Sequence, residues 1–454
     1  MIDLKTLTLE QAAFAVNGRL TGEGEFTGVY TDSRKPVQGG LFIALEGERF
    51  DGHDFIKNAE KDGAAAVICR KECDVSIPVI YVEDTKKALL SLASYYRGLF
   101  DIPVVGLTGS VGKTTTKEMT ALVLSEKYIT VKTQGNLNND IGMPMTLFNI
   151  EDTTEAAVIE MGMNHKGEIS TLTAVSRPSA SIITNIGVSH IENLGSRENI
   201  LSAKLEILEG MKKGSSLIIN GDNDLLSTVE NDEYRIIKFG IENENCSVRA
   251  VDIEASENST ICNILYNGEK YRCFVPVSGM HNVYDALSAF AAGVCMGVEP
   301  DVAAAAISKY VPAGMRQKVV VKNNITFIED CYNASPDSVK AGLNTLASFD
   351  GRRKIAVLGD MLELGSYAET AHRDCGKYAA EKNIDMLFAY GKDSSFTADE
   401  AVKNGLAKVY HFTDENELSE ALFNEIREND AILFKASRGM KLENVIHIIY
   451  DRMQ

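Results

Sequence analysis

The sequence contains no tryptophan, which decides nothing about its function, and positive charge is scarce in it. Lysine and arginine number 46 against 64 aspartates and glutamates, so the formal net charge is -18. A nucleic-acid partner is therefore not expected, because polyphosphate backbones bind basic surfaces. A small anionic substrate is compatible with this charge, provided that its site is locally cationic or holds a metal ion.

Long apolar runs are also absent. No stretch reaches the roughly 18 apolar residues of a membrane-spanning helix. The first residues, MIDLKTLTLEQAA, carry acidic residues early and lack the apolar segment of a signal peptide. The eight cysteines show no Cys-x-x-Cys spacing, which in a chain of this length indicates reduced thiols rather than a disulfide framework or a zinc site. We therefore predict a cytoplasmic protein without a membrane span.

The 454 residues are too many for one core and suggest about three domains. Residues 1–99 hold short strand-like runs between turns and short helices. Residues 100–313 alternate strands and helices, with nearly continuous apolar runs such as VVGLTG and AAVIEMG that are typical of parallel central strands. Pro312 and Gly314 mark a linker, and residues 314–454 repeat the alternation. The predicted fold is α/β, with a smaller N-terminal domain, a central parallel-sheet domain and a doubly wound, Rossmann-like C-terminal domain.

A glycine-rich turn between a strand and a helix, in VVGLTGSVGKTTTKEM at residues 104–119, is typical of a phosphate-binding loop. Leu107 stands where the general template has glycine, but backbone N–H groups of residues 109–114 can still surround an anion at a helix N-terminus. Lys113 can reach the β- and γ-phosphate oxygens, and Thr114 can bind Mg²⁺. The alternative is a structural turn with a surface lysine. The residues predicted to bind ATP here are Gly109, Ser110, Gly112, Lys113, Thr114 and Thr115.

The loop TGSVGKTT is similar to that of the Mur ligase family of peptidoglycan synthesis, and other segments agree in the family's order. They include TDSRKPVQGGLFIALEGERFDGHDF (31–55), TQGNLNNDIGMPMTL (133–147), EMGMNHKGEI (160–169), NIGVSHIENLGSRENILSAKLEI (185–207), HNVYDALSAF (281–290), EDCYNASPDS (329–338), LGDMLELG (358–365) and KASRGMKLENVI (435–446). The resemblance covers nearly the whole chain and is closest to the branch that adds D-alanyl-D-alanine. Met280 and Asp285 depart from it, standing where relatives usually have a basic residue and an asparagine.

This resemblance implies an ATP-dependent ligase that acts through an acyl phosphate. The donor would be UDP-N-acetylmuramoyl-tripeptide, the acceptor D-alanyl-D-alanine, and the cofactors ATP and Mg²⁺. Residues 1–99 would then bind the UDP-sugar, residues 100–313 ATP, and residues 314–454 the acceptor. The enzyme is expected to be a monomer. Because the first step brings a carboxylate onto a polyanion, it needs cations near the phosphate loop.

Three residues near the ends of predicted strands could hold the metal ion. Glu160 ends the run AAVIEMG, His190 follows IITNIGVSH, and Thr114 belongs to the phosphate loop. Taken singly, an acid at a strand end is often a solvated cap, and a lone histidine is often a surface group. Lys204 on its own indicates a solvated helix face. The resemblance instead implies that Lys204 carries CO₂ as a carbamate and is a further metal ligand, so the predicted catalytic set is Lys113, Glu160, His190 and Lys204.

The resemblance also suggests recognition residues. Asn282 would contact the adenine, Arg316 the phosphates, and Asp330 the ribose hydroxyls, a role that suits a carboxylate acceptor. ATP would then bridge two domains, and their closure would exclude water. For substrates, the candidates are Ser33, Arg34, Asp51, Gly52 and His53 for the uridine diphosphate, Asn136, Asn138 and Asn139 for the sugar-peptide, and Asn333, Ser335, Ser437 and Arg438 for the dipeptide.

Two alternatives remain open from the sequence. A sister ligase would add a diamino acid or glutamate, but the branch for lysine or diaminopimelate carries an Asp-Asn-Pro-Arg motif where this chain reads YNASPDS. A P-loop switch would make no product, and the separate sugar-nucleotide and third-domain motifs argue against it. The third residue of the donor peptide is not encoded in any motif found here.

Overall fold

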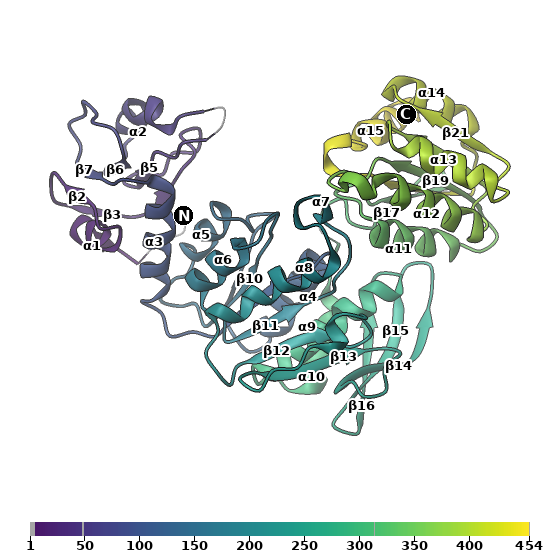
Figure 1. The fold of residues 1–454 in the computed structure, drawn as a ribbon, viewed down its shortest axis with the longest axis horizontal. Helices are drawn as coiled ribbons and strands as arrows, with labels where there is room; N and C mark the ends of the chain where they lie inside the picture. The colour runs from purple at the N-terminus through teal and green to yellow at the C-terminus, as the bar shows by residue number, and fades with distance from the viewer. Residues whose placement is uncertain (1–4, 48–49, 313, 454) are drawn as a thin grey trace.

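The computed structural model describes residues 5–47, 50–312 and 314–453. The predicted domain boundary at residue 313 and the first four residues of the N-terminal segment lie outside these ranges. Three α/β units follow one another along the chain, and the N- and C-terminal units lie on opposite sides of the central one (Figure 1). No helix in the described ranges is long and apolar enough to cross a bilayer.

The N-terminal unit is a small, mostly parallel sheet with helices. In its described part, five strands lie in the order β2-β7-β6-β5-β4, and β1 pairs with β3 beside them. The elements are β1 (Leu7–Thr8), α1 (Leu9–Ala15), β2 (Arg19–Leu20), β3 (Glu25–Phe26), β4 (Val29–Tyr30), β5 (Leu41–Ile43), η1 (Gly52–Phe55), α2 (Ile56–Lys61), β6 (Ala66–Cys69), β7 (Val79–Tyr81) and α3 (Thr85–Arg97).

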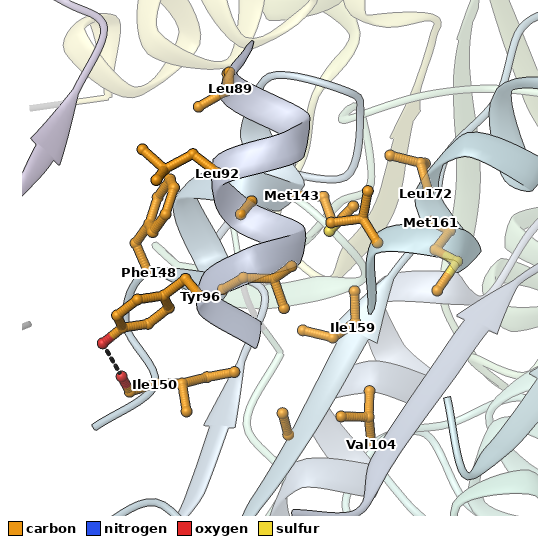
Figure 2. Close-up of a cluster of buried hydrophobic side chains, with 14 of the residues drawn as sticks. Leu89, Leu92, Tyr96, Val104, Met143, Phe148, Ile150, Ile159, Met161 and Leu172 are labelled. Carbon is orange, nitrogen blue, oxygen red and sulfur yellow. Dashed lines mark hydrogen bonds between the residues drawn. The ribbon is translucent and has the colours of Figure 1, made fainter. Parts of the chain in front are cut away.

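Helix α3 joins this unit to the central one. The Asp84 side chain caps its N-terminus by accepting from the N–H groups of Lys86 and Lys87. Its apolar face, including Leu92 and Tyr96, packs against residues of the central unit, where the Tyr96 hydroxyl donates to the Ile150 carbonyl at 2.6 Å (Figure 2). The two units therefore share one hydrophobic core.

The central unit is built on a mixed sheet. Within residues 104–275, all described, nine strands lie in the order β16-β15-β14-β13-β12-β11-β8-β10-β9. The elements are β8 (Val104–Thr108), α4 (Lys113–Ser125), β9 (Thr130–Lys132), α5 (Gly142–Leu147), β10 (Ala156–Glu160), α6 (Glu168–Ser176), β11 (Ala180–Ile183), α7 (Ile191–Leu194), α8 (Arg197–Leu205), η2 (Glu206–Gly210), β12 (Ser216–Asn220), η3 (Leu226–Thr228), β13 (Arg235–Gly240), β14 (Val248–Ala255), β15 (Thr260–Tyr266), β16 (Glu269–Val275), α9 (Met280–Cys295), α10 (Pro300–Ala306) and η4 (Ile307–Lys309).

The parallel part of this sheet is covered by helices on both faces, as the apolar strands predict. Helices α4, α9 and α10 pack against one face, while α3, α5 and α6 pack against the other. The end of the sheet differs from the prediction, because β14, β15 and β16 follow β13 without intervening helices and pair antiparallel. Asn267 and Gly268 both have positive φ, 51° and 84°, which suits the tight turn joining β15 to β16. The predicted strand–helix alternation is therefore wrong for residues 241–275.

The C-terminal unit is a second, smaller doubly wound sheet, as predicted. Within residues 318–435, all described, six strands lie in the order β17-β18-β22-β19-β20-β21, and only the edge strand β17 is antiparallel. The elements are β17 (Lys318–Lys322), β18 (Ile325–Glu329), α11 (Pro336–Ala347), β19 (Arg353–Gly359), η5 (Gly365–Tyr367), α12 (Ala368–Glu381), β20 (Met386–Tyr390), α13 (Ser394–Lys403), β21 (Val409–Phe412), α14 (Glu415–Glu425), β22 (Asp430–Lys435), η6 (Arg438–Met440) and α15 (Glu443–Arg452).

The C-terminal unit contacts the central one beside α7. Val188 and Ile191 of the central unit pack against the apolar core of the C-terminal unit. This contact brings loops that follow β8, β10 and β11 opposite loops that follow β18 and β19. Because ligands of parallel α/β sheets bind outside the carboxyl ends of the strands, two such edges now face one shared space.

Candidate active site

A cavity of about 830 Å³ lies between the central and C-terminal units. It collects many of the predicted residues from loops far apart in the sequence. Those lining it are Ser110, Gly112, Lys113, Thr114, Thr115, Asn136, Asn138, Asn139, Glu160, His190, Arg316, Asn333 and Ser335. The sequence did not single out Lys166, Tyr332 or Lys435, which line it as well.

The phosphate loop has the backbone that its glycines predict. Gly109 has φ 157°, and a Cβ at this position would collide with the Thr184 hydroxyl. Gly112 has φ 82° and precedes α4, whose first-turn N–H groups have no partner within the helix. The Lys113 ammonium donates to the Gly109 carbonyl at 2.8 Å and so spans the loop.

Asn185 modifies the predicted anion cradle. Its side-chain oxygen accepts from the Ser110 N–H at 3.1 Å and from the Val111 N–H at 2.9 Å. These two amides, which were expected to face a phosphate, are thus held by the protein. The N–H groups at the start of α4 remain for the anion, and Asn185 fixes the shape of the loop. Only the fold reveals this role, since Asn185 lies 74 residues beyond Val111 in sequence.

Lys113 is placed where its charge is costly. Burial lowers the pKa of its ammonium, the nearby Glu160 carboxylate raises it, and the Arg316 guanidinium lowers it further. A phosphate anion between Lys113 and Arg316 would relieve this repulsion. The arrangement is therefore suited to a triphosphate, which would bring negative charge between two cations from different units.

Glu160 is the last residue of β10 and is only 2% exposed. Its carboxylate accepts from the Thr114 hydroxyl at 3.1 Å and from the Asn138 amide at 2.8 Å. The buried Lys117 ammonium lies 3.8 Å from the same carboxylate and 3.1 Å from that of Glu118. The solvated-cap interpretation of Glu160 is therefore wrong. Lys117 was missed, although it follows Lys113 by one helical turn on α4.

Thr114 and Glu160 fit a magnesium ion that is also bound by a nucleotide. Both present oxygen atoms, which Mg²⁺ prefers, and Mg²⁺ usually takes only one or two protein ligands beside water and phosphate. Among the described residues, a close group of three acidic, histidine or cysteine ligand atoms occurs only at Glu46, Asp51 and His53 in the N-terminal unit. The central cavity therefore has no complete protein shell, and the phosphates would have to supply ligands.

His190 also lines the cavity and follows β11. Its φ is 63°, in the left-handed region that residues other than glycine seldom adopt. Its Nδ1 atom lies 2.8 Å from Oε2 of Glu363, a residue of the C-terminal unit. Glu363, which was not predicted, also has a left-handed backbone, with φ 64°. Two backbones in an uncommon conformation thus meet at the boundary between the units.

Lys204 is not on a solvated face. It lies on α8, is 1% exposed, and burial together with the charge of Lys113 lowers its pKa well below the usual value. A neutral amine is the form that reacts with CO₂, so the structure is compatible with the carbamate that the family resemblance implies. The surface alternative for Lys204 is wrong.

A second cavity, of about 220 Å³, adjoins the phosphate loop and brings Asn282, Arg316 and Asp330 together. The Asn282 amide donates to the Ser278 carbonyl and to the Gln317 side-chain oxygen, both at 2.7 Å. Asp330 pairs with the buried Lys435 ammonium at 2.8 Å. Gln317 and Lys435 were missed, because their importance depends on partners brought together by the fold.

Asp285 faces this second cavity from α9. It is buried, accepts a hydrogen bond from the Thr116 hydroxyl at 2.9 Å, and lies against Gly112. Burial raises the pKa of Asp285 to about 8, and the Thr116 hydrogen bond opposes this only in part. At neutral pH the side chain is therefore mostly an uncharged acid, close in shape and hydrogen bonding to an asparagine. This explains how an aspartate can occupy a position where the resembled family usually has asparagine.

Comparison with known proteins agrees with this geometry. The family descriptions "Mur ligase family, catalytic domain", "Mur ligase middle domain" and "Mur ligase, glutamate ligase domain" match residues 25–97, 107–293 and 315–438, respectively. The chain belongs to the Mur ligase family.

The chain is 43% identical over 429 residues to the UDP-N-acetylmuramoyl-tripeptide--D-alanyl-D-alanine ligase of Bacillus subtilis strain 168, with 92% of each chain covered. The crystal structure of MurF from Acinetobacter baumannii is similar with a TM-score of 0.93 and 31% identity, over 99% of this chain and 100% of that one. MurF ligase from Thermotoga maritima, solved in complex with ADP, gives a TM-score of 0.85 at 27% identity, over 94% and 97% of the two chains.

The residues predicted for the dipeptide have different surroundings in this Mur ligase. Ser335 caps α11 and Asn333 lines the large cavity. Ser437 is buried and accepts from the Leu362 N–H at 2.9 Å, so it ties two loops together instead of lining the cavity. Arg438 is exposed and pairs with Glu443 at 2.7 Å.

Tyr332 links the cavity to Arg438. The Arg316 guanidinium lies 3.9 Å from the centre of the Tyr332 ring, and that of Arg438 lies 6.0 Å from it. Tyr332 lines the cavity, so one ring lies near both Arg316 of the cavity and Arg438, which does not line it. In the sequence, nothing distinguishes Tyr332 beyond its place in the motif EDCYNASPDS.

The residues predicted for the uridine diphosphate lie in the N-terminal unit, outside the two cavities described above. Asp51 and His53 bind each other at 2.6 Å, and the Arg70 N–H donates to the other ring nitrogen of His53 at 2.9 Å. Gly52 passes so close to Leu45 that a Cβ would lie 2.7 Å from its backbone. Ser33 and Arg34 are in an open turn, where Arg34 pairs with Asp32 at 2.9 Å.

Proposed function

We propose that this Mur ligase joins D-alanyl-D-alanine to the tripeptide carboxylate of UDP-N-acetylmuramoyl-tripeptide, with ATP cleaved to ADP and phosphate. The observation that carries the proposal is the single cavity in which the phosphate loop faces Arg316, Tyr332 and Asn333 of the C-terminal unit. Nucleotide and acceptor can therefore meet in one shared cavity. The 43% identity to a Bacillus subtilis enzyme of that name, over 92% of both chains, supports this branch of the family.

The first step transfers the γ-phosphoryl group to the donor carboxylate. Lys113 and Arg316 stabilise the negative charge that gathers on the phosphate oxygens, and the N–H groups at the start of α4 bind the same anion. Glu160 and Thr114 would hold Mg²⁺, which would supply further neutralisation of the phosphate charge. The donor carboxylate needs no strong base, because it is already ionised when it attacks.

In the second step, the amine of the acceptor attacks the acyl carbon and phosphate leaves. The reaction needs a neutral amine and a cavity without water, since water would hydrolyse the acyl phosphate. Loops of the C-terminal unit line the same cavity as the phosphate loop. Asn333 and Ser335 are placed to bind the dipeptide amide, and Arg438, beyond Tyr332, to bind its carboxylate. Ser437 does not touch the dipeptide in this proposal, but it ties together the two loops that contain Leu362 and Arg438.

In this proposal, residues of the second cavity bind the adenine and ribose of the nucleotide. Asn282, whose amide donates to the Gln317 side chain, binds the adenine. Asp330 accepts from the ribose hydroxyls while Lys435 holds it in place. The asparagines that follow β9, Asn136, Asn138 and Asn139, bind the sugar-peptide. The uridine diphosphate binds at Ser33, Arg34 and the turn that contains Asp51, Gly52 and His53.

Lys204 is the site of a carbamate in this proposal. Its neutral amine adds to CO₂ with loss of one proton, which gives a carbamate anion with two oxygen atoms. The neutral state favoured by burial supports this modification. With Glu160, His190 and Thr114, the carbamate would complete the residues that hold Mg²⁺.

The organisation proposed for the chain follows from these roles. Residues 1–99 bind the UDP-sugar, residues 100–313 ATP, and residues 314–454 the acceptor. We further propose that the enzyme works as a monomer in the cytoplasm, where ATP is supplied. The eight cysteines, all in the described part of the chain, are free, which suits a reducing compartment.

A panel of acceptors tests the proposal. Phosphate release is measured with ATP, Mg²⁺ and UDP-N-acetylmuramoyl-tripeptides that carry either lysine or diaminopimelate at the third position. D-alanyl-D-alanine should support release, while D-alanine, L-lysine, diaminopimelate and D-glutamate should not. Preference for a diamino acid would identify a sister ligase, and release independent of both donor and acceptor would identify a P-loop ATPase switch.

A further inference from the structure

The contact between His190 and Glu363 joins the central and C-terminal units beside the reaction cavity. His190 lines the cavity and its side chain is 19% exposed, whereas the Glu363 side chain is 58% exposed. The two groups come from different units and lie far apart in the sequence. His190, which lines the cavity, is thus in contact with the C-terminal unit, and that unit also contributes residues to the cavity lining.

The geometry leaves Glu363 as the group that can orient the imidazole. Nδ1 of His190 lies 2.8 Å from Glu363 Oε2, but it is buried and has no hydrogen bond of good geometry among the described residues. If this carboxylate accepts from Nδ1, Nε2 is the ring nitrogen left for a ligand in the cavity.

The packing around this pair shows that the contact is part of a built interface. Val188 and Ile191, on either side of His190, pack against the C-terminal core, which includes Leu364 beside Glu363. Gly365 has φ 52°, and a Cβ there would lie 3.0 Å from the Glu192 side chain. The left-handed backbones of His190 and Glu363 cost conformational energy, which surrounding packing must offset.

We propose that Glu363 is a positioning residue for the reaction: it fixes the His190 ring across the boundary between the units, so that Nε2 faces the nucleotide-bound metal ion only when the C-terminal unit is seated against α7. This inference rests on the proposed role of His190 as a metal ligand. Its consequence is that assembly of the metal site depends on the position of the C-terminal unit. A domain that binds the acceptor thereby also controls phosphoryl transfer.

Metal affinity separates this role from a purely structural one. Mn²⁺ replaces Mg²⁺ in the full-length enzyme saturated with a non-hydrolysable ATP analogue, and free Mn²⁺ is measured by electron paramagnetic resonance. Glu363→Ala should weaken Mn²⁺ binding by roughly 10- to 100-fold, the range found when a carboxylate partner of a metal-binding histidine is removed. Glu363→Gln, which keeps an oxygen acceptor, should recover part of the loss.

Two further variants control for folding and for the interface. Glu363→Gly suits the left-handed backbone, so its thermal midpoint should not fall below that of wild type, yet Mn²⁺ should bind as weakly as in Glu363→Ala. Glu192→Gln removes a neighbouring carboxylate of the same interface and should leave Mn²⁺ affinity unchanged. The kinetic counterpart is a higher Mg²⁺ concentration for half-maximal rate in Glu363→Ala.

His190→Ala makes failure of the two proposals distinguishable. If His190→Ala weakens Mn²⁺ binding and Glu363→Ala does not, Glu363 is no positioning residue, while the metal role of His190 stands. If His190→Ala binds Mn²⁺ like wild type, the metal role and this inference both fail, and the acceptor panel still decides whether the chain is a ligase. Equal losses in Glu192→Gln and Glu363→Ala would also overturn the inference, since any damage to the interface would then suffice.

Discussion

Replacing Asp285 with asparagine should make the protein more stable at neutral and alkaline pH. The buried Asp285 has a pKa of about 8, against 3.8 for an aspartate in its ordinary, exposed state. Between these two values the unfolded chain has released the proton and the folded chain still holds it. Stability contributed by this site therefore falls as pH rises from about 4 to about 8.

The magnitude follows from the difference in pKa. About four pKa units at 1.36 kcal/mol each give roughly 5 to 6 kcal/mol as the upper limit of the penalty above pH 8. The asparagine of the Asp285→Asn variant has no proton to lose and can still accept from the Thr116 hydroxyl. For a unit of this size, each kcal/mol moves the thermal midpoint by about 2 to 4 °C. We expect Asp285→Asn to raise the midpoint by several degrees at pH 8.

Scanning calorimetry from pH 5 to pH 9 provides the measurement, with the transition of the central unit followed. The difference in midpoint between Asp285→Asn and wild type should grow steadily with pH. Asp301→Asn, at an exposed aspartate, is the matched control and should give a small difference at every pH. If the difference in thermal midpoint between Asp285→Asn and wild type is the same at pH 5 and pH 8.5, the reasoning is refuted. The proton held by the buried Asp285 would then make no contribution to the pH dependence of stability.

The other predictions concern turnover. Lys113→Ala should lower kcat by roughly 10²-fold or more, as expected for loss of one group that stabilises the transferring phosphoryl group, and near-normal steady-state turnover would contradict this role. Lys204→Ala should be almost inactive, and added formate or acetate should restore part of the rate by filling the space of the carbamate; full activity without them would remove the metal role. Arg438→Ala should raise KM for the dipeptide more than KM for ATP, whereas equal changes would place Arg438 outside the acceptor site.

The sequence predicted those features whose cause is local. The turn between β8 and α4 depends on glycines and a helix start within a few residues, and the buried parallel strands depend on continuous apolar runs; the structure contains both. The antiparallel end of the central sheet was missed, although Asn267 and Gly268 form a recognisable hairpin signal. Strands and helices alternate almost without interruption before residue 240, and the prediction wrongly continued this alternation through residues 241–275.

The parts of the site that were missed depend on contacts between distant segments. Asn185 binds amides of the phosphate loop, and Glu363 meets His190 only because two units pack together. Lys117 looks like an ordinary helix lysine until the structure shows that it is 0% exposed beside Glu118 and Glu160. A pattern in one segment cannot predict such pairs, since neither partner alone is unusual.

The fate of the donor oxygen tests the central claim most directly. The donor tripeptide is labelled with ¹⁸O in both oxygens of its terminal carboxylate, and the released phosphate is analysed by mass spectrometry after reaction with ATP and D-alanyl-D-alanine. Attack of the carboxylate on the γ-phosphate, followed by displacement by the amine, predicts one ¹⁸O atom in each phosphate and one in the new amide. Phosphate without ¹⁸O would contradict an acyl phosphate and, with it, the ligase mechanism proposed for this chain.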